Sequence, residues 1–239
     1  MGPFANQLAD CQTQDNLAIK ALALLRQSKP DLPFFSVCLQ KNVPIASGVG
    51  GGSCDAAFII KRIARDYDID LNSSNVQQSL LNLGADMPVC VGGYPALMSG
   101  IGEVVEPIAA FPSYAIVVVN PLISLSASDV YKNFHTQNKG HYSDALPPHP
   151  VVKDQKIWTE FLHDQTNDLQ PPAENQCPAI YEIIKNLSIQ EGALLSRMSG
   201  SGATCFALFT SNQMAIKAAS DLAEQYPAYW IKTGSIAEK

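Results

Sequence analysis

The sequence predicts an α+β fold in which short strands and helices alternate. Residues 114–119 and 204–209 are apolar runs of the kind that form buried strands. Residues 16–27 instead carry apolar side chains at helical spacing. The expected strands are short and compatible with antiparallel pairing. This pattern favours α+β over a doubly wound parallel sheet.

The other elements follow from periodicity, caps, and glycine or proline breaks. Residues 85–93 are expected to form a loop that turns into a short strand, and the polar, proline-rich segment 135–153 a mobile surface loop. Helices are expected over 16–27, 53–67, 73–83, 126–134, 154–164, 174–187 and 212–225. Strands are expected over 34–40, 95–99, 103–108, 114–119, 204–209 and 230–233.

Composition bounds the class of protein. With 239 residues, 46% of them hydrophobic, the chain can bury one large core or two small ones. A net charge of -6 with scattered basic residues gives no footprint for nucleic acid or an anionic membrane. There is no long apolar run and no signal-peptide core near Met1. These features favour a cytoplasmic protein that binds neither nucleic acid nor a membrane.

The cysteines and histidines give no sign of a metal site. No two cysteines form a CxxC pair, so we expect reduced thiols, mostly in apolar surroundings, and no protein metal ligands. All four histidines lie in or beside polar segments and are expected at the surface. The cysteines are Cys11, Cys38, Cys54, Cys90, Cys177 and Cys205, and the histidines are His135, His141, His149 and His163.

A glycine-rich loop carries most of the functional information: Pro44-Ile-Ala-Ser-Gly-Val-Gly-Gly-Gly-Ser-Cys-Asp-Ala-Ala57. It lies between an expected strand and an expected helix. There, backbone amides and the positive end of the helix dipole can hold an anion. Ser53 can cap the helix or bond a phosphate oxygen. Asp55 is expected to be structural instead of catalytic, because an acid in the first turn of a helix complements the helix dipole.

Two familiar phosphate templates do not fit this loop. The P-loop pattern needs a lysine after its last glycine, and none follows here. The dinucleotide pattern fits Gly48 and Gly50 but meets Ser53 where its third glycine belongs. A tight turn without a ligand stays an alternative.

The loop does resemble the ATP-phosphate loop of the GHMP kinases. Residues 84–90, Gly-Ala-Asp-Met-Pro-Val-Cys, narrow the resemblance to the branch that phosphorylates a cytidine-diphosphate-linked methylerythritol. Asn120-Pro121, Asn167-Asp168-Leu169 and residues 200–203 are similar in order and spacing, so the resemblance covers essentially the whole chain. It implies a ribosomal-protein-S5-like N-terminal domain over 1–118 and a ferredoxin-like C-terminal domain over 119–239.

The resemblance implies an ATP-dependent kinase acting on the substrate's 2-hydroxyl in non-mevalonate isoprenoid and terpenoid synthesis. ATP and Mg²⁺ would be the cofactors, and without a dense acidic cluster the nucleotide and water would mainly hold the magnesium. Asp86 would be the general base. Tyr131 would stack on the cytosine, and Gly200, Ser201 and Gly202 would contact the substrate. ATP would be held by Pro44, Ile45, Ala46, Ser47, Gly48, Val49, Gly50, Gly51, Gly52, Ser53 and Cys54.

The chain also departs from that family. Members carry about sixty further residues before the point that matches Met1, a sizeable part of a typical domain. That stretch includes a lysine that partners the catalytic aspartate and an Asp-Gly-Tyr-His segment that binds cytosine. Lys20, Lys41 and Lys61 lie in other contexts. Another GHMP kinase, a non-catalytic nucleotide-binding homologue and, more distantly, a dinucleotide oxidoreductase therefore stay open. Cys54 stands where many members have serine.

Overall fold

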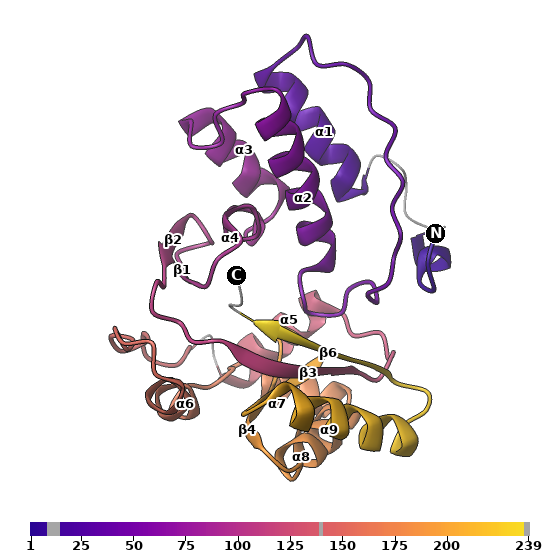
Figure 1. The fold of residues 1–239 in the computed structure, drawn as a ribbon, viewed down its shortest axis with the longest axis vertical. Helices are drawn as coiled ribbons and strands as arrows, with labels where there is room; N and C mark the ends of the chain where they lie inside the picture. Colours follow the sequence, from indigo (N-terminus) through magenta and orange to yellow (C-terminus); the bar gives the residue numbers. More distant parts are fainter. Residues whose placement is uncertain (9–14, 139–140, 237–239) are drawn as a thin grey trace. The chain divides into compact units, whose positions relative to one another are not determined.

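The computed structural model describes residues 1–8, 15–138 and 141–236, which form two compact units (Figure 1). Unit 1 comprises Met1–Ile45 and Gly50–Ile108. Unit 2 comprises Ala46–Val49 and the chain from Ala109 onward. The short segment Ala46–Val49 therefore packs with unit 2, although the residues on both sides of it belong to unit 1.

In the residues that the structure describes, unit 1 is built on four α-helices that pack against one another. Their apolar faces bury Leu25, Ile60, Leu80 and Met87 almost completely. Gly84 ends the third helix, as expected. After a one-turn 3-10 helix (Ala5–Leu8), the elements are α1 (Leu17–Ser28), α2 (Gly51–Asp66), α3 (Ser74–Leu83), α4 (Met87–Gly92) and a hairpin of β1 (Ala96–Ser99) and β2 (Val104–Pro107).

Two expectations in unit 1 are wrong. Residues 34–40 are extended but form no strand ladder in the described part of the chain, and Phe34 is 92% exposed. A β-type composition makes a strand only where a partner accepts its hydrogen bonds. Residues 85–93 form the short helix α4 instead of a strand. Pro88 suits its first turn, and Gly93 ends it in the left-handed conformation.

Unit 2 contains a four-stranded sheet in the order β4-β5-β3-β6. All its pairings are antiparallel, with Val117 of β3 opposite both Ala207 and Thr233. The sheet confirms the α+β class. Its strands are β3 (Tyr114–Asn120), β4 (Ala193–Met198), β5 (Cys205–Phe209) and β6 (Trp230–Ile236).

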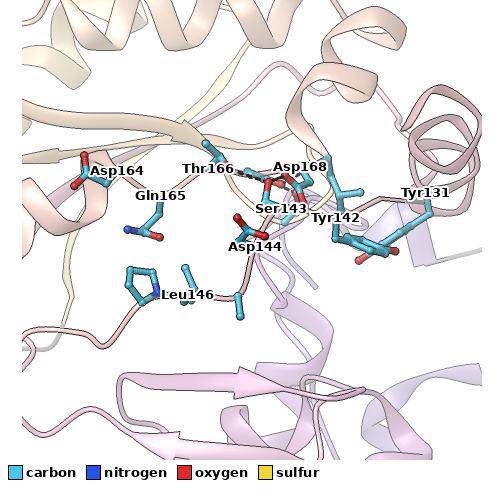
Figure 2. A pocket seen from close by; sticks show the side chains of 14 residues that line it. Tyr131, Tyr142, Ser143, Asp144, Leu146, Asp164, Gln165, Thr166 and Asp168 are labelled. Atoms are coloured by element: carbon cyan, nitrogen blue, oxygen red, sulfur yellow. Dashed lines mark hydrogen bonds between the residues drawn. The ribbon is translucent and has the colours of Figure 1, made fainter. Parts of the chain in front are cut away.

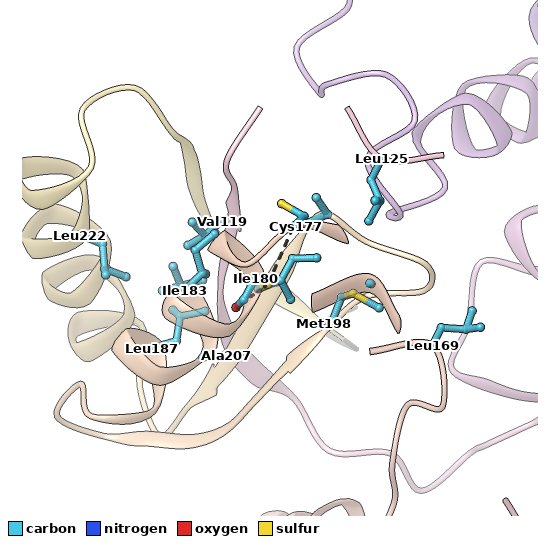
Figure 3. Packing of buried hydrophobic residues seen from close by; sticks show 14 of the residues in the cluster. Val119, Leu125, Leu169, Cys177, Ile180, Ile183, Leu187, Met198, Ala207 and Leu222 are labelled. Carbon is cyan, nitrogen blue, oxygen red and sulfur yellow. Dashed lines mark hydrogen bonds between the residues drawn. The ribbon is translucent and has the colours of Figure 1, made fainter. Parts of the chain in front are cut away.

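Helices α8 and α9 pack on this sheet and form the core of unit 2 with it (Figure 1). Figure 3 shows Ile180 and Ile183 of α8 and Leu222 of α9 against Val119 and Ala207 of the strands. The helices of unit 2 are α5 (Ala127–Asn138), α6 (Gln155–His163), α7 (Gln170–Gln176), α8 (Ala179–Ser188) and α9 (Asn212–Gln225).

Unit 2 also differs from expectation in three places. The helix expected over 174–187 is two helices, because Pro178 cannot continue a hydrogen-bonded helix. Helix α5 runs past Phe134, so residues 135–138 are helical instead of part of the loop. Strand β4 was not expected.

The thiols and histidines mostly follow expectation. The five cysteines within the described residues are free thiols, and Cys11 lies outside those residues. The expectation of apolar surroundings is wrong for Cys38 and Cys54, which are exposed. Three histidines are exposed, whereas His149 is half-buried and stacks on Trp158. Among the residues described, no helix combines the length and apolar character that crossing a bilayer requires.

Candidate active site

The glycine loop opens helix α2 in a way that only glycine allows easily. Gly50 caps the helix with φ of 64°, and Gly48 has φ of 78°, both in the left-handed region. Gly51 and Gly52 form the first turn, whose amides have no partner within the helix. Ser53 lies buried in the same turn, at 7% exposure, and Gly50 is the cap, so the expectation that Ser53 caps the helix is wrong. Its bond to a phosphate oxygen stays a prediction. The helix start is therefore suited to bind an anion.

Asp86 lies against this helix start. Ser53 Oγ donates a 2.9 Å hydrogen bond to Asp86 Oδ1. The other carboxylate oxygen, Oδ2, faces Gly50, where a side chain would lie 3.4 Å from it, an ordinary contact. Asp86 follows Gly84 and precedes α4, which fixes its backbone between two helices. Two separate sequence motifs thus meet within unit 1.

Lys41 is a site residue that sequence reasoning set aside. Its side chain is only 7% exposed, and its Nζ lies 2.7 Å from Asp55 Oδ2. A side chain at Gly51 would be 3.7 Å from the same Nζ, so the ammonium sits beside the first turn of α2. Asp55 lies beyond the first turn of α2, so the expected pairing with the helix dipole is wrong, and its structural partner is Lys41 instead. The sequence signal for this site residue was the position of Lys41 shortly before Pro44. Its burial could not be predicted, because it depends on residues later in the chain.

In unit 2, Ala46–Val49 packs directly on the second glycine segment, residues 198–204. Ser199 Oγ donates to Gly48 O at 2.8 Å, and Thr204 N donates to Ser47 O at 3.3 Å. A side chain at Gly48 would come within 2.6 Å of the carbonyl oxygens of Ser199 and Gly202. The two predicted glycine segments are therefore in van der Waals contact. Pro44 and Ser47 are buried and Ala46 is exposed.

A pocket of about 990 Å³ in unit 2 brings further predicted residues together. Figure 2 shows Tyr131 and Tyr142 at one end and Gln165 toward the other. Gly200 also lines the pocket, whereas Ser201 and Gly202 are not among its lining residues. Tyr131 is 46% exposed, so its ring is accessible to a ligand.

Two side chains of the Asn167-Asp168-Leu169 motif hold this pocket together. Asn167 Nδ2 donates to Gly200 O at 2.9 Å and to Met198 O at 3.1 Å. Asp168 accepts a 2.8 Å hydrogen bond from Ser143 N and a second one from Ser143 Oγ. The motif thus fixes both the second glycine segment and the chain around Ser143.

The described residues of the site provide no cage of protein side chains for a metal ion. Within residues 1–8, 15–138 and 141–236, no three histidine, cysteine or acidic side chains lie close enough to hold one. The two carboxylates near the glycine loop already interact with protein groups, Asp55 with Lys41 and Asp86 with Ser53. This donor set suits a magnesium ion that arrives with nucleotide phosphates and keeps its waters.

A glycine loop that opens a helix beside a carboxylate, on an antiparallel α+β fold, defines a small-molecule kinase of the GHMP class. Residues 16–94 match the GHMP kinases N terminal domain, and residues 154–228 match the GHMP kinases C terminal domain. The chain is accordingly an ATP-dependent kinase, and its GHMP kinase fold is confirmed.

Individual relatives narrow the GHMP kinase class to one family. A 4-diphosphocytidyl-2-C-methyl-D-erythritol kinase from Paramagnetospirillum magneticum is 37% identical over 96% of this chain and 78% of its own length. One from Roseobacter denitrificans is 40% identical over 100% of this chain and 78% of its own. The crystal structure of a 4-(cytidine 5'-diphospho)-2C-methyl-D-erythritol kinase matches with a TM-score of 0.74 and 26% identity, over 93% of this chain and 79% of that one. The chain belongs to the 4-diphosphocytidyl-2-C-methyl-D-erythritol kinase family of isoprenoid synthesis.

A second solved structure has a similar fold at low sequence identity. The homoserine kinase from Cytophaga hutchinsonii matches with a TM-score of 0.69 at 15% identity, over 95% of this chain and 77% of its own. At that identity the likeness concerns the fold, so the branch of the family is defined by the closer relatives and not by this structure.

Proposed function

We propose that this chain transfers the γ-phosphoryl group of ATP to the 2-hydroxyl of 4-diphosphocytidyl-2-C-methyl-D-erythritol. The names of its relatives supply the substrate. The observation that carries the chemistry is the hydrogen bond from Ser53 to Asp86, 2.9 Å long, at the start of the glycine-loop helix. It puts a carboxylate beside backbone amides that suit a phosphate group.

ATP would be held mainly by backbone groups of the glycine loop. The amides of residues 48–53 and the positive end of α2 would neutralise the β- and γ-phosphates, whereas Cys54 N already donates to Gly50 O at 2.8 Å. Lys41, beside Gly51 and paired with Asp55, would keep the first turn of α2 in place. Phosphoryl transfer depends chiefly on positioning and on charge neutralisation, which such a loop provides. Pro44 and the segment 45–47 would support it from the N-terminal side.

Asp86 would act as the general base. Because Oδ1 accepts from Ser53, Oδ2 is the oxygen that faces Gly50 and would accept the hydroxyl proton. As the proton leaves, the substrate oxygen would bond to the γ-phosphorus and the bond to the β,γ-bridging oxygen would break. ADP and the phosphorylated product would then leave. Ser53 would hold the carboxylate in one rotamer throughout.

We propose Mg²⁺ as the metal cofactor. Bound to the ATP phosphates, it would neutralise charge that develops on the transferred group. The chain would contribute one or two oxygen atoms at most, in keeping with the absence of an acidic cage in the described residues.

The pocket of unit 2 would bind the cytidine diphosphate end of the substrate. Tyr131, exposed on α5, would stack on the cytosine ring, since stacking works on the face of any base. Gly200, held by Asn167, would allow close approach of the substrate, with Ser201 and Gly202 following it. The volume of the pocket, about 990 Å³, is enough for a nucleotide.

We also propose that the chain works in the cytoplasm. ATP is supplied there, and free thiols at Cys38, Cys54, Cys90, Cys177 and Cys205 are typical of a reducing compartment. The partner would be the small-molecule substrate, with neither nucleic acid nor membrane required.

The substitution Asp86→Asn tests the proposed base. We expect the rate of phosphoryl transfer to fall by about 10²–10⁴, the usual contribution of a positioned base, while ATP affinity is kept. The rate is measured from product formation and the affinity by calorimetric titration with ATP and Mg²⁺.

Asp221→Asn is the matched control, because that carboxylate pairs with Lys217 on the surface of α9. Undiminished turnover in Asp86→Asn would remove Asp86 as the base. A wild-type chain that phosphorylates no substrate would overturn the proposed function itself.

A further inference from the structure

Two cysteine side chains lie together in unit 1, and the proposed reaction uses neither thiol. Cys54 is in the first turn of α2 and Cys90 is in α4. Their Sγ atoms are 4.0 Å apart. That separation is about 2 Å longer than a disulfide bond, a gap that small rotamer and backbone adjustments can close.

The surroundings give the two thiols different chemistry. Once Cys54 is ionised, Cys90 can donate an S–H hydrogen bond to it, and this bond is the main cause that lowers the pKa of Cys54 to about 7. Lys41 acts in the same direction, whereas burial, Asp86 and Asp55 act against it. The same hydrogen bond, together with burial, raises the pKa of Cys90. Cys54 is therefore the nucleophile of the pair, and Cys90 is placed to resolve it.

A cavity of about 520 Å³ leads to both thiols. Lys61, Arg62 and Arg65 line it together with Phe58. Asp66 pairs with both arginines, but Lys61 has no ion-pair partner among the residues that the structure describes. A cavity of this size and charge suits a small anionic molecule.

We propose that Cys54 and Cys90 form a reversible disulfide by exchange with an anionic low-molecular-weight disulfide of the glutathione type, and that this disulfide stops phosphoryl transfer. The Cys54 thiolate attacks one sulfur of glutathione disulfide, which forms a mixed disulfide and releases one glutathione thiolate. Cys90 then loses its proton and attacks Sγ of Cys54, which releases the second glutathione. Two protein thiols are oxidised and one glutathione disulfide is reduced to two thiols.

The disulfide would act on the residues of the proposed reaction, and this half of the inference rests on the proposed function. Cys54 is next to Ser53, and Cys90 N donates to the carbonyl of Asp86 at 3.0 Å. Joining the sulfurs pulls α2 and α4 together at the point where Ser53 holds Asp86. A displacement of about 1 Å at a catalytic group can lower a rate by about 10²-fold.

The test uses the wild-type chain in buffers with a fixed ratio of reduced to oxidised glutathione. After acid quenching and alkylation, peptide mass spectrometry without reduction identifies the partner of each cysteine. We expect a peptide linked through Cys54 and Cys90. We also expect a rate of phosphoryl transfer that is lower by at least about tenfold and recovers with dithiothreitol.

Two variants serve as controls. Cys38→Ser removes another exposed thiol and should leave both responses unchanged. Cys90→Ser should end with glutathione on Cys54 and no internal disulfide. Alkylation of Cys54 by iodoacetamide should rise with pH and reach half its maximum near pH 7, because the thiolate reacts. In Cys90→Ala that midpoint should move upward.

Each contrary result has a distinct meaning. If Cys54 and Cys90 stay reduced, or carry glutathione separately, at a ratio that modifies Cys38, the disulfide site is overturned. If the linked peptide forms and phosphoryl transfer is undiminished, the effect on activity is overturned. If the reduced chain transfers no phosphoryl group, the proposed function fails, while the peptide map still decides the disulfide.

Discussion

Lys41 and Asp55 show how single residues stabilise the glycine loop. Lys41 is almost completely buried, while Asp55 is 34% exposed, and Asp55 Oδ2 accepts a 2.7 Å hydrogen bond from Lys41 Nζ. In every other ion pair of the described part of the chain, the basic side chain is at least 43% exposed. Exposed pairs contribute little to stability, whereas removing one partner of a buried pair leaves an unpaired charge or an unfilled polar site.

The substitution Lys41→Met should therefore destabilise unit 1. We expect a loss of about 1–3 kcal/mol in the free energy of unfolding, less than for a fully buried pair because Asp55 still contacts water. Urea denaturation followed by circular dichroism measures it. Lys20→Met is the matched control, since Lys20 and Asp15 are 3.5 Å apart and both well exposed. Equal losses in the two variants would contradict the structural role of Lys41.

Several contacts at this scale could not be predicted from sequence. The glycine loop and Asp86 were recognised separately from their motifs, but the hydrogen bond between Ser53 and Asp86 joins residues far apart in the chain. The proximity of Cys54 to Cys90 is likewise a result of how α2 packs on α4. Sequence patterns indicate which residues carry chemistry, and tertiary packing decides which of them meet.

At the scale of elements, glycines in one loop have opposite roles. Gly48 has φ of 78°, and a side chain there would come within 2.6 Å of the carbonyl oxygens of Ser199 and Gly202. Gly52 lies within α2, where a side chain would meet only Leu17 Cδ1 at 3.4 Å, an ordinary contact. The first glycine is required by backbone conformation and close approach, and the second is required by neither.

Alanine at these two positions should therefore change stability in opposite directions. Gly48→Ala should lower the free energy of unfolding by at least about 1 kcal/mol from the left-handed conformation alone. Gly52→Ala should raise it by up to about 1 kcal/mol, because alanine favours helix. Urea denaturation of wild type and both variants measures the two changes in the free energy of unfolding. A neutral Gly48→Ala would show that Ala46–Val49 does not pack tightly on residues 198–204.

The elements that sequence analysis missed share a physical reason. Residues 34–40 have strand composition but pair with no strand among the described residues, although Leu39 O accepts a hydrogen bond from the Met1 amino group. Residues 85–93 have apolar β-type residues but follow helix geometry set by Pro88 and Gly93. Strand β4 is partly exposed and mixes polar with apolar residues, so its pairing with β5 comes from the sheet and not from its own pattern. By contrast, α9 has clear caps and periodicity and was predicted to the residue.

At the scale of the molecule, each unit has a hydrophobic core of its own. Leu25, Ile60 and Leu80 belong to the core of unit 1. Ile180 and Phe209 belong to the core of unit 2. Units with separate cores can unfold as separate cooperative steps, and a single two-state transition is then not expected.

The two tryptophans make this testable, because Trp158 and Trp230 are both in unit 2. Tryptophan fluorescence thus reports on unit 2, whereas circular dichroism reports on the helices of both units. Ile180→Ala and Leu80→Ala each remove a fully buried side chain and should cost about 2–5 kcal/mol. Ile180→Ala should lower the urea midpoint seen by fluorescence. Leu80→Ala should leave the fluorescence midpoint unchanged and lower the urea midpoint of only one part of the transition seen by circular dichroism. Equal shifts of the fluorescence midpoint in both variants would show that the two units unfold as one.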